Sequence, residues 1–438
     1  MSASTLASPA APPLRHDAAV IGLVGAAHSV SHFSQLLLAP LFPWLKDEFN
    51  VSYTQLGLLL TIFFVTSTAV QAASGFVVDR FGPRPVLLAG LSLLGLAALG
   101  YANSHSYAML AASAVVAGIG NGVFHPVDYT LLNRKVHKSR LGHAYSAHGI
   151  TGTLGWALAP ALMVPVALAS GWRVAMLCAA AVAFAVLALL WWQRDRLALE
   201  LPASPATGPA AARQAAALAP AAGATGAGSA AVAGPAPEGP FDFLRIPAVW
   251  MCLLFFLFYA FALSVVQSFA PEAARHLHAV PAHLVAACLS IYMVCSACGM
   301  VLGGFLAADP ARCERVVGVG MGLAACVALS VAFLPMAPAM VPVMFGLMGA
   351  VSGSAGPSRD MLVKRSTPDN ASGRVFGVVY TGLDIGQAIA PLIFGRLMDL
   401  QHYRSVWIGL ALVQLVLIVS AFNVRKVRRT VQPAARPA

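Results

Sequence analysis

Apolar runs long enough to cross a bilayer recur along the whole chain, separated by short polar segments. A helix needs about 20 predominantly apolar residues to span roughly 30 Å of hydrocarbon. By this criterion the sequence predicts twelve membrane-spanning helices. Their approximate bounds are 18–44, 54–78, 85–103, 107–132, 141–168, 172–193, 246–270, 283–308, 315–335, 339–363, 373–395 and 405–424. The first run is too long for the core of a cleaved signal peptide, so we expect it to remain as a span.

The composition agrees with this pattern. Of 438 residues, 59% are hydrophobic and 10% are charged, and the mean hydropathy is +0.77. Soluble domains carry about 25% charged residues, and a chain of this length cannot hide so much apolar surface in water-soluble cores. The composition excludes a soluble enzyme, a disordered protein and a disulfide-stapled secreted domain, and it predicts an all-α membrane protein.

The basic residues carry topological information. There are 27 Lys and Arg against 16 Asp and Glu, a formal charge of +11. Between the predicted spans, 21 of the 27 fall on the side of the amino terminus, five fall on the opposite side, and Arg359 lies within a span. The positive-inside rule therefore predicts a protein of the cell (inner) membrane with both termini in the cytoplasm. Since the basic residues are scattered over short loops, we expect a lipid bilayer and no nucleic acid as partner.

One segment differs from the rest. Residues 199–240 are mostly Ala, Pro and Gly and contain no aromatic residue, so they cannot bury enough apolar area to order themselves. We predict a cytoplasmic linker there, with docking to a partner as the alternative. The expected organisation is a tail at 1–17, a six-helix bundle at 18–198, the linker at 199–240, a second bundle at 241–424 and a basic tail at 425–438.

The two predicted bundles resemble each other in sequence. A single offset of 231 residues aligns prolines, glycines and other residues near the span ends, among them Pro40 with Pro271, Pro126 with Pro357, Arg134 with Arg365, Gly155 with Gly386 and Pro160 with Pro391. Spans of equal index in the two halves run in the same direction. The pattern predicts twelve transmembrane helices in two parallel six-helix repeats, an arrangement typical of transporters whose site lies between the halves.

The loop between spans 2 and 3 carries a recognisable motif. Gly75, Asp79, Arg80, Gly82 and Arg84 follow the order G-x-x-x-D-R-x-G-x-R, with Pro83 in place of a further basic residue. This loop resembles the signature loop of the major facilitator superfamily. The resemblance implies the major facilitator fold, transport without enzymatic activity, and a loop that latches the cytoplasmic side of the two halves. We expect a monomer, although no residue of the sequence fixes the oligomeric state.

Two further stretches resemble one branch of that superfamily, the fosmidomycin-resistance type. The first is the end of span 1 with its following loop, from His32-Phe33-Ser34-Gln35 through Leu45-Lys46-Asp47-Glu48-Phe49 to Tyr53-Thr54-Gln55-Leu56-Gly57. The second is Phe124-His125-Pro126 late in span 4. Members of this branch export drugs. The second half, at Gly356–Asp360, does not match the branch, so the substrate stays open.

Small residues in span 5 give a second, ambiguous signal for export. Gly149, Gly152, Gly155 and then Pro160 resemble the antiporter motif of drug exporters. Small residues at this spacing are also ordinary devices for close helix packing. Where proton-coupled exporters place an Arg in span 4, this chain has Ala114.

Polar side chains within the spans are the candidate functional residues, because such groups are costly in lipid and usually face the bundle interior. His28, His32 and Gln35 share one face of span 1 near the midplane, and the repeat places Tyr259 opposite His28. Histidine titrates near neutral pH and can carry protons or bind anions. The alternative is neutral imidazoles that only hydrogen-bond to neighbouring spans.

Asp384 lies about ten residues into span 11, near the midplane. Such a carboxylate can bind a proton in one conformation and release it in the other; the alternative is a buried structural hydrogen bond. His148 lies at a similar depth and is a candidate partner, and Tyr380 is a candidate lining residue. Lesser candidates are Asn121, His125, Tyr145, Tyr292 and Gln387.

Asp128 and Arg359 occupy repeat-equivalent positions near the cytoplasmic ends of spans 4 and 10. We predict that they form a cytoplasmic gate with Asp360, Asp79 and Arg84, through ion pairs that hold the outward-open state. In the alternative, Arg359 binds a carboxylate of the solute.

Together these features predict a secondary transporter of a small organic solute, coupled to protons and working by alternating access. A drug/proton antiporter and a transporter-like membrane sensor are the alternatives. The chain lacks a G-x-x-x-x-G-K-[ST] nucleotide loop. We expect no catalytic residue, cofactor or metal site, because Cys295 and Cys298 lie in a span without a second pair at zinc spacing.

Overall fold

A computed structural model describes residues 13–199, 247–306, 312–358 and 372–431, with side chains at all of these except 248, 372–380 and 420–431. Over these ranges the chain is almost entirely helical. The first half contains α1 (Leu14–Gln35), α2 (Phe42–Phe49), α3 (Tyr53–Phe81), α4 (Pro83–Ala102), α5 (Tyr107–Asn121), α6 (Phe124–Lys135), α7 (Leu141–Ser170) and α8 (Trp172–Trp192). The second half contains α10 (Pro247–Ser268), α11 (Ala270–His278), α12 (Ala282–Leu306), α13 (Cys313–Phe333), α14 (Met340–Ser354), α16 (Ser372–Asp399) and α17 (Tyr403–Val431).

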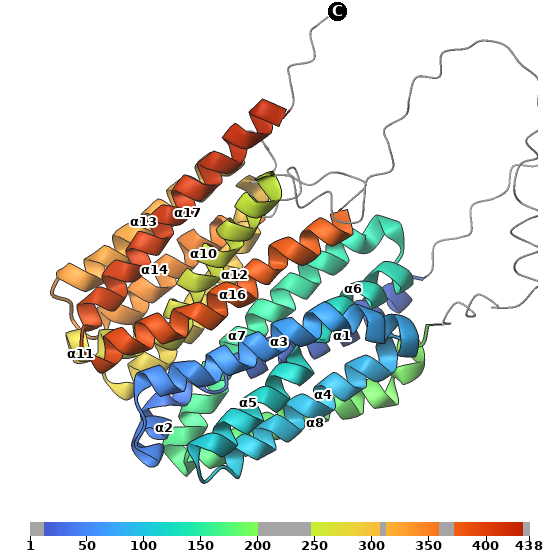
Figure 1. Ribbon diagram of the computed structural model, residues 1–438, viewed down its shortest axis with the longest axis horizontal. Helices are drawn as coiled ribbons and strands as arrows, with labels where there is room; N and C mark the ends of the chain where they lie inside the picture. The colour runs from blue at the N-terminus through green and yellow to red at the C-terminus, as the bar shows by residue number, and fades with distance from the viewer. Residues whose placement is uncertain (1–12, 200–246, 307–311, 359–371, 432–438) are drawn as a thin grey trace, which may run out of the picture.

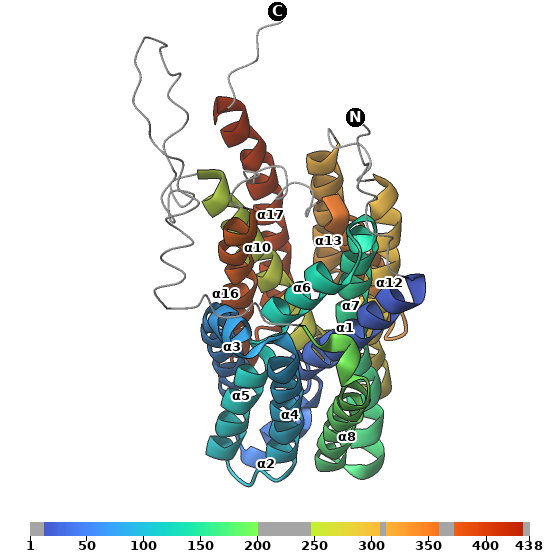
Figure 2. The same cartoon turned by 90° about the vertical axis from the view of Figure 1, so that its right-hand side faces the viewer.

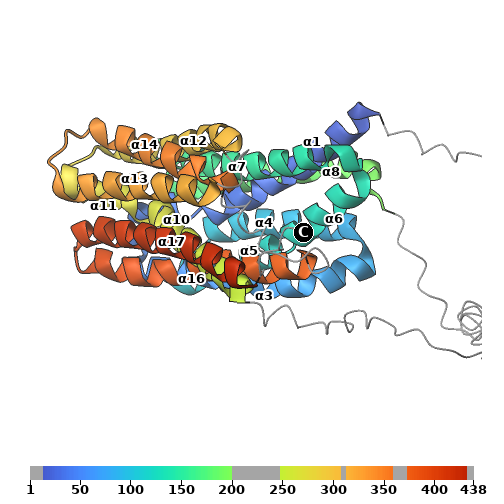
Figure 3. The same cartoon turned by 90° about the horizontal axis from the view of Figure 1, so that it is seen from above.

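These helices form two bundles that lie side by side, α1–α8 and α10–α17 (Figures 1 and 3). Among the described residues, ten helical segments are long and apolar enough to cross a membrane. The long helices α16 and α17 fall outside this set and correspond in order to the predicted spans 373–395 and 405–424. The predicted fold class, twelve helices in two parallel six-helix repeats, is confirmed. The linker predicted at 199–240 falls, apart from its first residue, outside the described ranges.

Prolines break the helices at the same places in both halves. α5 ends at Asn121 and α6 begins at Phe124, directly before His125 and Pro126. A proline removes one helical hydrogen bond and its ring clashes with the carbonyl four residues earlier, which is Gly122 here. Figure 2 shows that α6 leaves α5 at an angle. At the repeat-equivalent place α14 ends at Ser354, just before Pro357. The same holds near Pro40, in a 3₁₀ turn, and near Pro271, the second residue of α11, directly after the break that follows α10.

The halves contact each other tightly near the end that carries α2 and α11. The carboxylate of Asp399, at the end of α16, accepts hydrogen bonds from the backbone N–H groups of Tyr53 (2.6 Å) and Thr54 (3.0 Å) at the start of α3. It thereby caps a helix of the other half, a role that carboxylates commonly play. A Cβ atom on Gly57 would lie 2.5 Å from the carbonyl oxygen of Pro391, so α3 and α16 meet backbone to backbone.

Farther along α3 the contact with the second half changes. Gln71 donates a hydrogen bond of 3.4 Å from Nε2 to Asp384 Oδ2 of α16. Past Gln71, α3 exposes large side chains, with Phe76 80% and Phe81 59% exposed. The inter-half hydrogen bonds observed here therefore lie between the α2–α11 end and the level of Gln71.

Candidate functional site: a histidine cluster beside the second half

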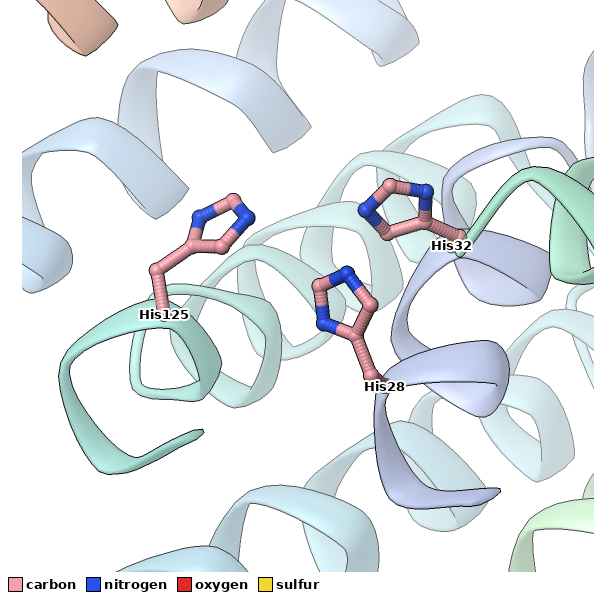
Figure 4. A group of neighbouring side chains, drawn as sticks. All are labelled: His28, His32 and His125. Atoms are coloured by element: carbon pink, nitrogen blue, oxygen red, sulfur yellow. The ribbon is translucent and has the colours of Figure 1, made fainter. Parts of the chain in front are cut away.

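Four imidazoles from three helices meet in the first half. His28 and His32 lie one turn apart on α1, with ring centroids 4.4 Å apart. His148 of α7 stacks on His28 at 3.5 Å between centroids, and the ring of His125 on α6 lies 5.4 Å from that of His28. Figure 4 shows His28, His32 and His125 facing one another. The helix break before Pro126 determines where the His125 side chain enters this cluster.

Glycines allow α7 to approach α1 at the level of the cluster. A Cβ atom on Gly155 would lie 2.2 Å from the carbonyl oxygen of Ser29, and one on Gly152 would lie 2.8 Å from the ring of His32. The same atom on Gly149 would meet nothing within 4 Å. Two of the three glycines of the span-5 pattern therefore act as close-packing residues.

Asp128 of α6 joins the cluster as a buried hydrogen-bond acceptor. Its Oδ2 lies 2.9 Å from His28 Nδ1 and 3.1 Å from His148 Nε2. A carboxylate oxygen accepts hydrogen bonds, so both imidazole N–H groups donate to it. The Asp128 side chain is 0% exposed, and its Oδ1 has no hydrogen-bond partner among the described residues. The carboxylate thus sets the orientation of two rings.

The predicted gate residues are only partly described. The structure places Asp128 with the histidines, while Asp79, Arg80 and Gly75 are exposed. Gly82 turns the chain between α3 and α4 at a positive φ of 84°, and Arg84 is half-buried. Arg359 and Asp360 lie outside the described residues, so the gate remains a prediction.

Gln71 connects the cluster to the second half. Its Oε1 lies 2.9 Å from His125 Nδ1, while its Nε2 donates to Asp384. His148, the suggested partner of Asp384, contacts Asp128 instead. Sequence reasoning missed Gln71, although a polar residue in the middle of an apolar span was a usable signal.

Further polar groups extend the cluster along α1. Gln35 accepts a hydrogen bond of 2.9 Å from the indole N–H of Trp156, whose ring centroid lies 4.2 Å from that of His32. Ser31 donates to Asn121, which in turn donates to Ser67 of α3. Tyr259 of α10 is half-buried, and the side chain of Tyr380 is outside the described set. The predicted face of span 1 is therefore a continuous polar surface.

Two repeated six-helix bundles with a polar cluster beside their interface define the architecture of a secondary transporter. The sequence matches the family profile of the Major Facilitator Superfamily in two segments, residues 24–347 and 253–438, and the chain belongs to this superfamily. The predicted family is confirmed, and with it a multi-pass membrane protein.

Comparison with individual proteins adds partial matches. The chain is 30% identical over 145 residues to the fosmidomycin resistance protein of Escherichia coli (strain K12), covering 33% of this chain and 35% of that protein. It is 24% identical over 163 residues to a probable sulfoacetate transporter of Cupriavidus necator, covering 37% of this chain and 38% of that protein. These alignments thus span little more than a third of either relative.

A solved structure shows the same fold over the full length. The crystal structure of a bacterial homologue of the human lysosomal transporter Spinster, in an inward-facing and occupied conformation, aligns with a TM-score of 0.73. The alignment covers 97% of this chain and 100% of that chain at 14% sequence identity.

Proposed function

We propose that this chain is a proton-coupled secondary transporter of a small organic anion that works by alternating access. The observation that carries the proposal is the Gln71 side chain, which bridges Asp384 in the second half and His125 in the first. Alternating access moves the two halves relative to each other, so this bridge must be remade in every cycle. Protonation of Asp384 gives the carboxyl a hydrogen that it can donate to Gln71, whereas the carboxylate can only accept a hydrogen bond. The hydrogen bonds of the bridge therefore depend on proton binding.

The solute class follows from the groups around the bridge. His32 and His125 are partly exposed, and a protonated imidazole offers N–H groups on both ring nitrogens. Such donors suit the oxygens of an anionic solute. The partial match to a probable sulfoacetate transporter supports an organic anion.

The orientation follows from the basic residues. With 21 of 27 Lys and Arg on the side where α1 begins, we infer that this side is cytoplasmic and that the membrane is the inner membrane. The end joined by Asp399 then faces outward, and its contacts support an inward-facing arrangement.

The test uses purified protein in proteoliposomes, with a panel of small organic anions that includes sulfoacetate, with and without an imposed pH gradient. The wild type should accumulate one of them only with the gradient. Asp384→Asn should lose accumulation yet keep exchange of labelled for unlabelled solute, because exchange needs no net proton movement. Asp47→Asn, an exposed carboxylate near the opposite end of the first half, is the matched control. Full gradient-driven accumulation by Asp384→Asn would overturn the coupling assignment.

Drug export by proton antiport is the second candidate, favoured by the 30% identity to the fosmidomycin resistance protein. Drug export and anion import differ in the direction in which the solute moves relative to the protons. An exporter would drive fosmidomycin against its gradient when protons flow the opposite way, whereas an importer would move solute and protons together. A chain that moves no solute in either direction would favour the sensor instead.

A further inference from the structure

We infer that His28, His32 and His125 form a binding site for a divalent transition-metal cation of the Zn²⁺, Co²⁺ or Ni²⁺ type. This site goes beyond the proposed function, which needs only protons and an organic solute. The sequence alone predicted no metal site, because Cys295 and Cys298 lack a second pair at zinc spacing.

The first argument is the arrangement of the three rings. One ligand nitrogen from each residue lies within 4.8 Å of the other two. In Figure 4 each ring directs a nitrogen into the space that the three share. A tetrahedral centre with metal–nitrogen bonds of about 2.1 Å places its ligands about 3.4 Å apart. Rotations that bring the nitrogens closer by roughly 1.4 Å therefore complete the site.

The second argument is the set of groups behind the rings. His28 Nδ1 contacts Asp128 Oδ2 at 2.9 Å, and His125 Nδ1 contacts Gln71 Oε1 at 2.9 Å. Both partners are oxygen acceptors, so each Nδ1 carries the proton and each Nε2 keeps its lone pair. Metal-binding histidines typically have this support, with the second nitrogen donating to a carboxylate or carbonyl oxygen.

The alternative role, imidazoles that only stabilise the bundle, leaves part of the geometry unexplained. Buried polar atoms in a fold are normally hydrogen-bonded. Here Nδ1 of His32 is buried without a hydrogen-bond partner among the described residues, and the hydrogen bonds observed for His28 and His125 use Nδ1, not Nε2. A cation in the shared space would satisfy the three Nε2 atoms together.

The ligand set also selects the metal. Imidazole nitrogens suit Zn²⁺, Co²⁺, Ni²⁺ and Cu²⁺, while Mg²⁺ and Ca²⁺ require oxygen ligands. Three protein ligands leave a fourth position for water or a solute oxygen. His32 and His125 are partly exposed, so an ion can reach the site, whereas His28 is buried and fixed by Asp128.

A second group, His28, Asp128 and His148, has ligand atoms equally close together. Its nitrogens already donate to Asp128, and all three side chains are buried. This group therefore supports the rings, and the ion binds on the exposed side.

The experiment is metal titration of the full chain, purified in detergent with an affinity tag that contains no histidine. Co²⁺ is the probe because its visible spectrum reports tetrahedral coordination by nitrogen, and Zn²⁺ is the competitor. We expect one Co²⁺ per chain, displaced by Zn²⁺. His32→Gln and His125→Gln should each weaken binding at least about 100-fold, and Asp128→Asn should weaken it about 10- to 100-fold.

Controls separate this site from others. His105→Gln and His143→Gln replace exposed histidines and should leave binding unchanged. The exposed thiols of Cys298 and Cys326 are replaced by Ser in every variant, to remove sulfur ligands. Thermal unfolding in detergent checks that each variant is folded. If His28→Gln fails that check, His125→Gln on a different helix carries the same prediction.

Either of two results would overturn the inference: wild type that binds no Co²⁺, or a folded His32→Gln, His125→Gln double variant with unchanged affinity and spectrum. Asp47→Asn, an exposed carboxylate outside the bridge, should bind Co²⁺ as the wild type does. Metal binding in detergent requires no transport, so this proposal and the proton-coupling proposal can fail separately.

Discussion

The two halves share a backbone plan but differ in their interiors. Both halves break near equivalent prolines, Pro126 and Pro357. The offset of 231 residues, however, places Leu263 at the position of His32 and Gly356 at that of His125. Duplication has kept where the helices bend and approach one another, and it has not kept the chemistry.

Asp384 is a functional candidate of the second half that has no chemical counterpart in the first half. Its counterpart in the first half is Thr153, and the counterpart of Gln71 is Leu302. The first half therefore supplies the imidazoles and the amide, and the second half supplies the carboxyl that the amide contacts. A repeat-equivalent position predicts backbone geometry reliably and functional chemistry poorly.

The largest expected effect comes from replacing Asp384 of the second half by threonine, the residue at the equivalent position 153 of the first half. Asp384→Thr removes the only group of the bridge that we assign to proton transfer. Gradient-driven accumulation in proteoliposomes should therefore fall at least about 100-fold, because loss of a group that transfers a proton typically has an effect of this size. Thr153→Ser, at the equivalent position, should have little effect. Accumulation above about half of wild type in Asp384→Thr would show that the halves do not divide the chemistry as described.

Close packing should be equally important in both halves. A Cβ atom on Gly155 or on Gly386 would lie 2.2 Å from a backbone carbonyl oxygen of the neighbouring helix. Overpacking of this kind costs about 1–3 kcal/mol, so Gly155→Ala and Gly386→Ala should both lower the thermal unfolding midpoint in detergent. Gly149→Ala, with open space at its Cβ, is the control. A loss of stability in only one half would mean that the backbone plan is not shared.

Gln71, which forms the bridge, can be replaced by leucine, the residue at the equivalent position 302 of the second half. Gln71→Leu leaves His125 Nδ1 and Asp384 Oδ2 without this partner. Hydrogen bonds to charged groups contribute about 1.5–3 kcal/mol, which corresponds to a change in rate of roughly 10- to 100-fold. Because the contact with Asp384 is long, we expect the transport rate to fall by the lower figure. Leu302→Gln, the reciprocal change at a largely exposed side chain, should leave the transport rate unchanged. Equal rates for Gln71→Leu and wild type would remove the bridge from the mechanism.

The smallest effect is expected at the closed end. Asp399→Asn replaces the carboxylate that caps α3, and a weakened cap costs about 0.5–2 kcal/mol. The population with this end open should rise a few-fold. Spin labels at exposed positions 47 and 283, one in each half at this end, would report the change as a longer distance. Asp195→Asn, near the opposite end, should leave the distance distribution as in the wild type.

The parts of the fold that depend on local sequence were predictable. Span length depends on apolar composition, so the twelve helices follow from neighbouring residues. Proline breaks helices, but the break before Pro126, inside the predicted span 107–132, was not predicted. The face of span 1 that carries His28 and Gln35 was also predicted, because it depends only on helical periodicity.

The association of residues from different helices was not predictable in this way. Asp128 was assigned to a gate because of its repeat partner, whereas the structure places it against His28 and His148, which are 100 and 20 residues away in sequence. That contact depends on the rotation of α6 after its break and on the close approach of α7 to α1. A single sequence specifies neither. Gln71 was missed because its two partners, His125 and Asp384, are 54 and 313 residues away in sequence.

The Gln71 amide has two chemically different ends, and this has a consequence for communication between the halves. In the observed arrangement its oxygen receives a hydrogen from His125 and its nitrogen gives one to Asp384. A protonated Asp384 that offers its own hydrogen to the amide requires the amide to turn over and present its nitrogen to His125. His125 Nδ1 would then have to accept, and the ring hydrogen would move to Nε2. The orientation of the Gln71 amide thus couples the protonation state of Asp384 in one half to the tautomer of His125 in the other. This coupling requires no movement of a helix.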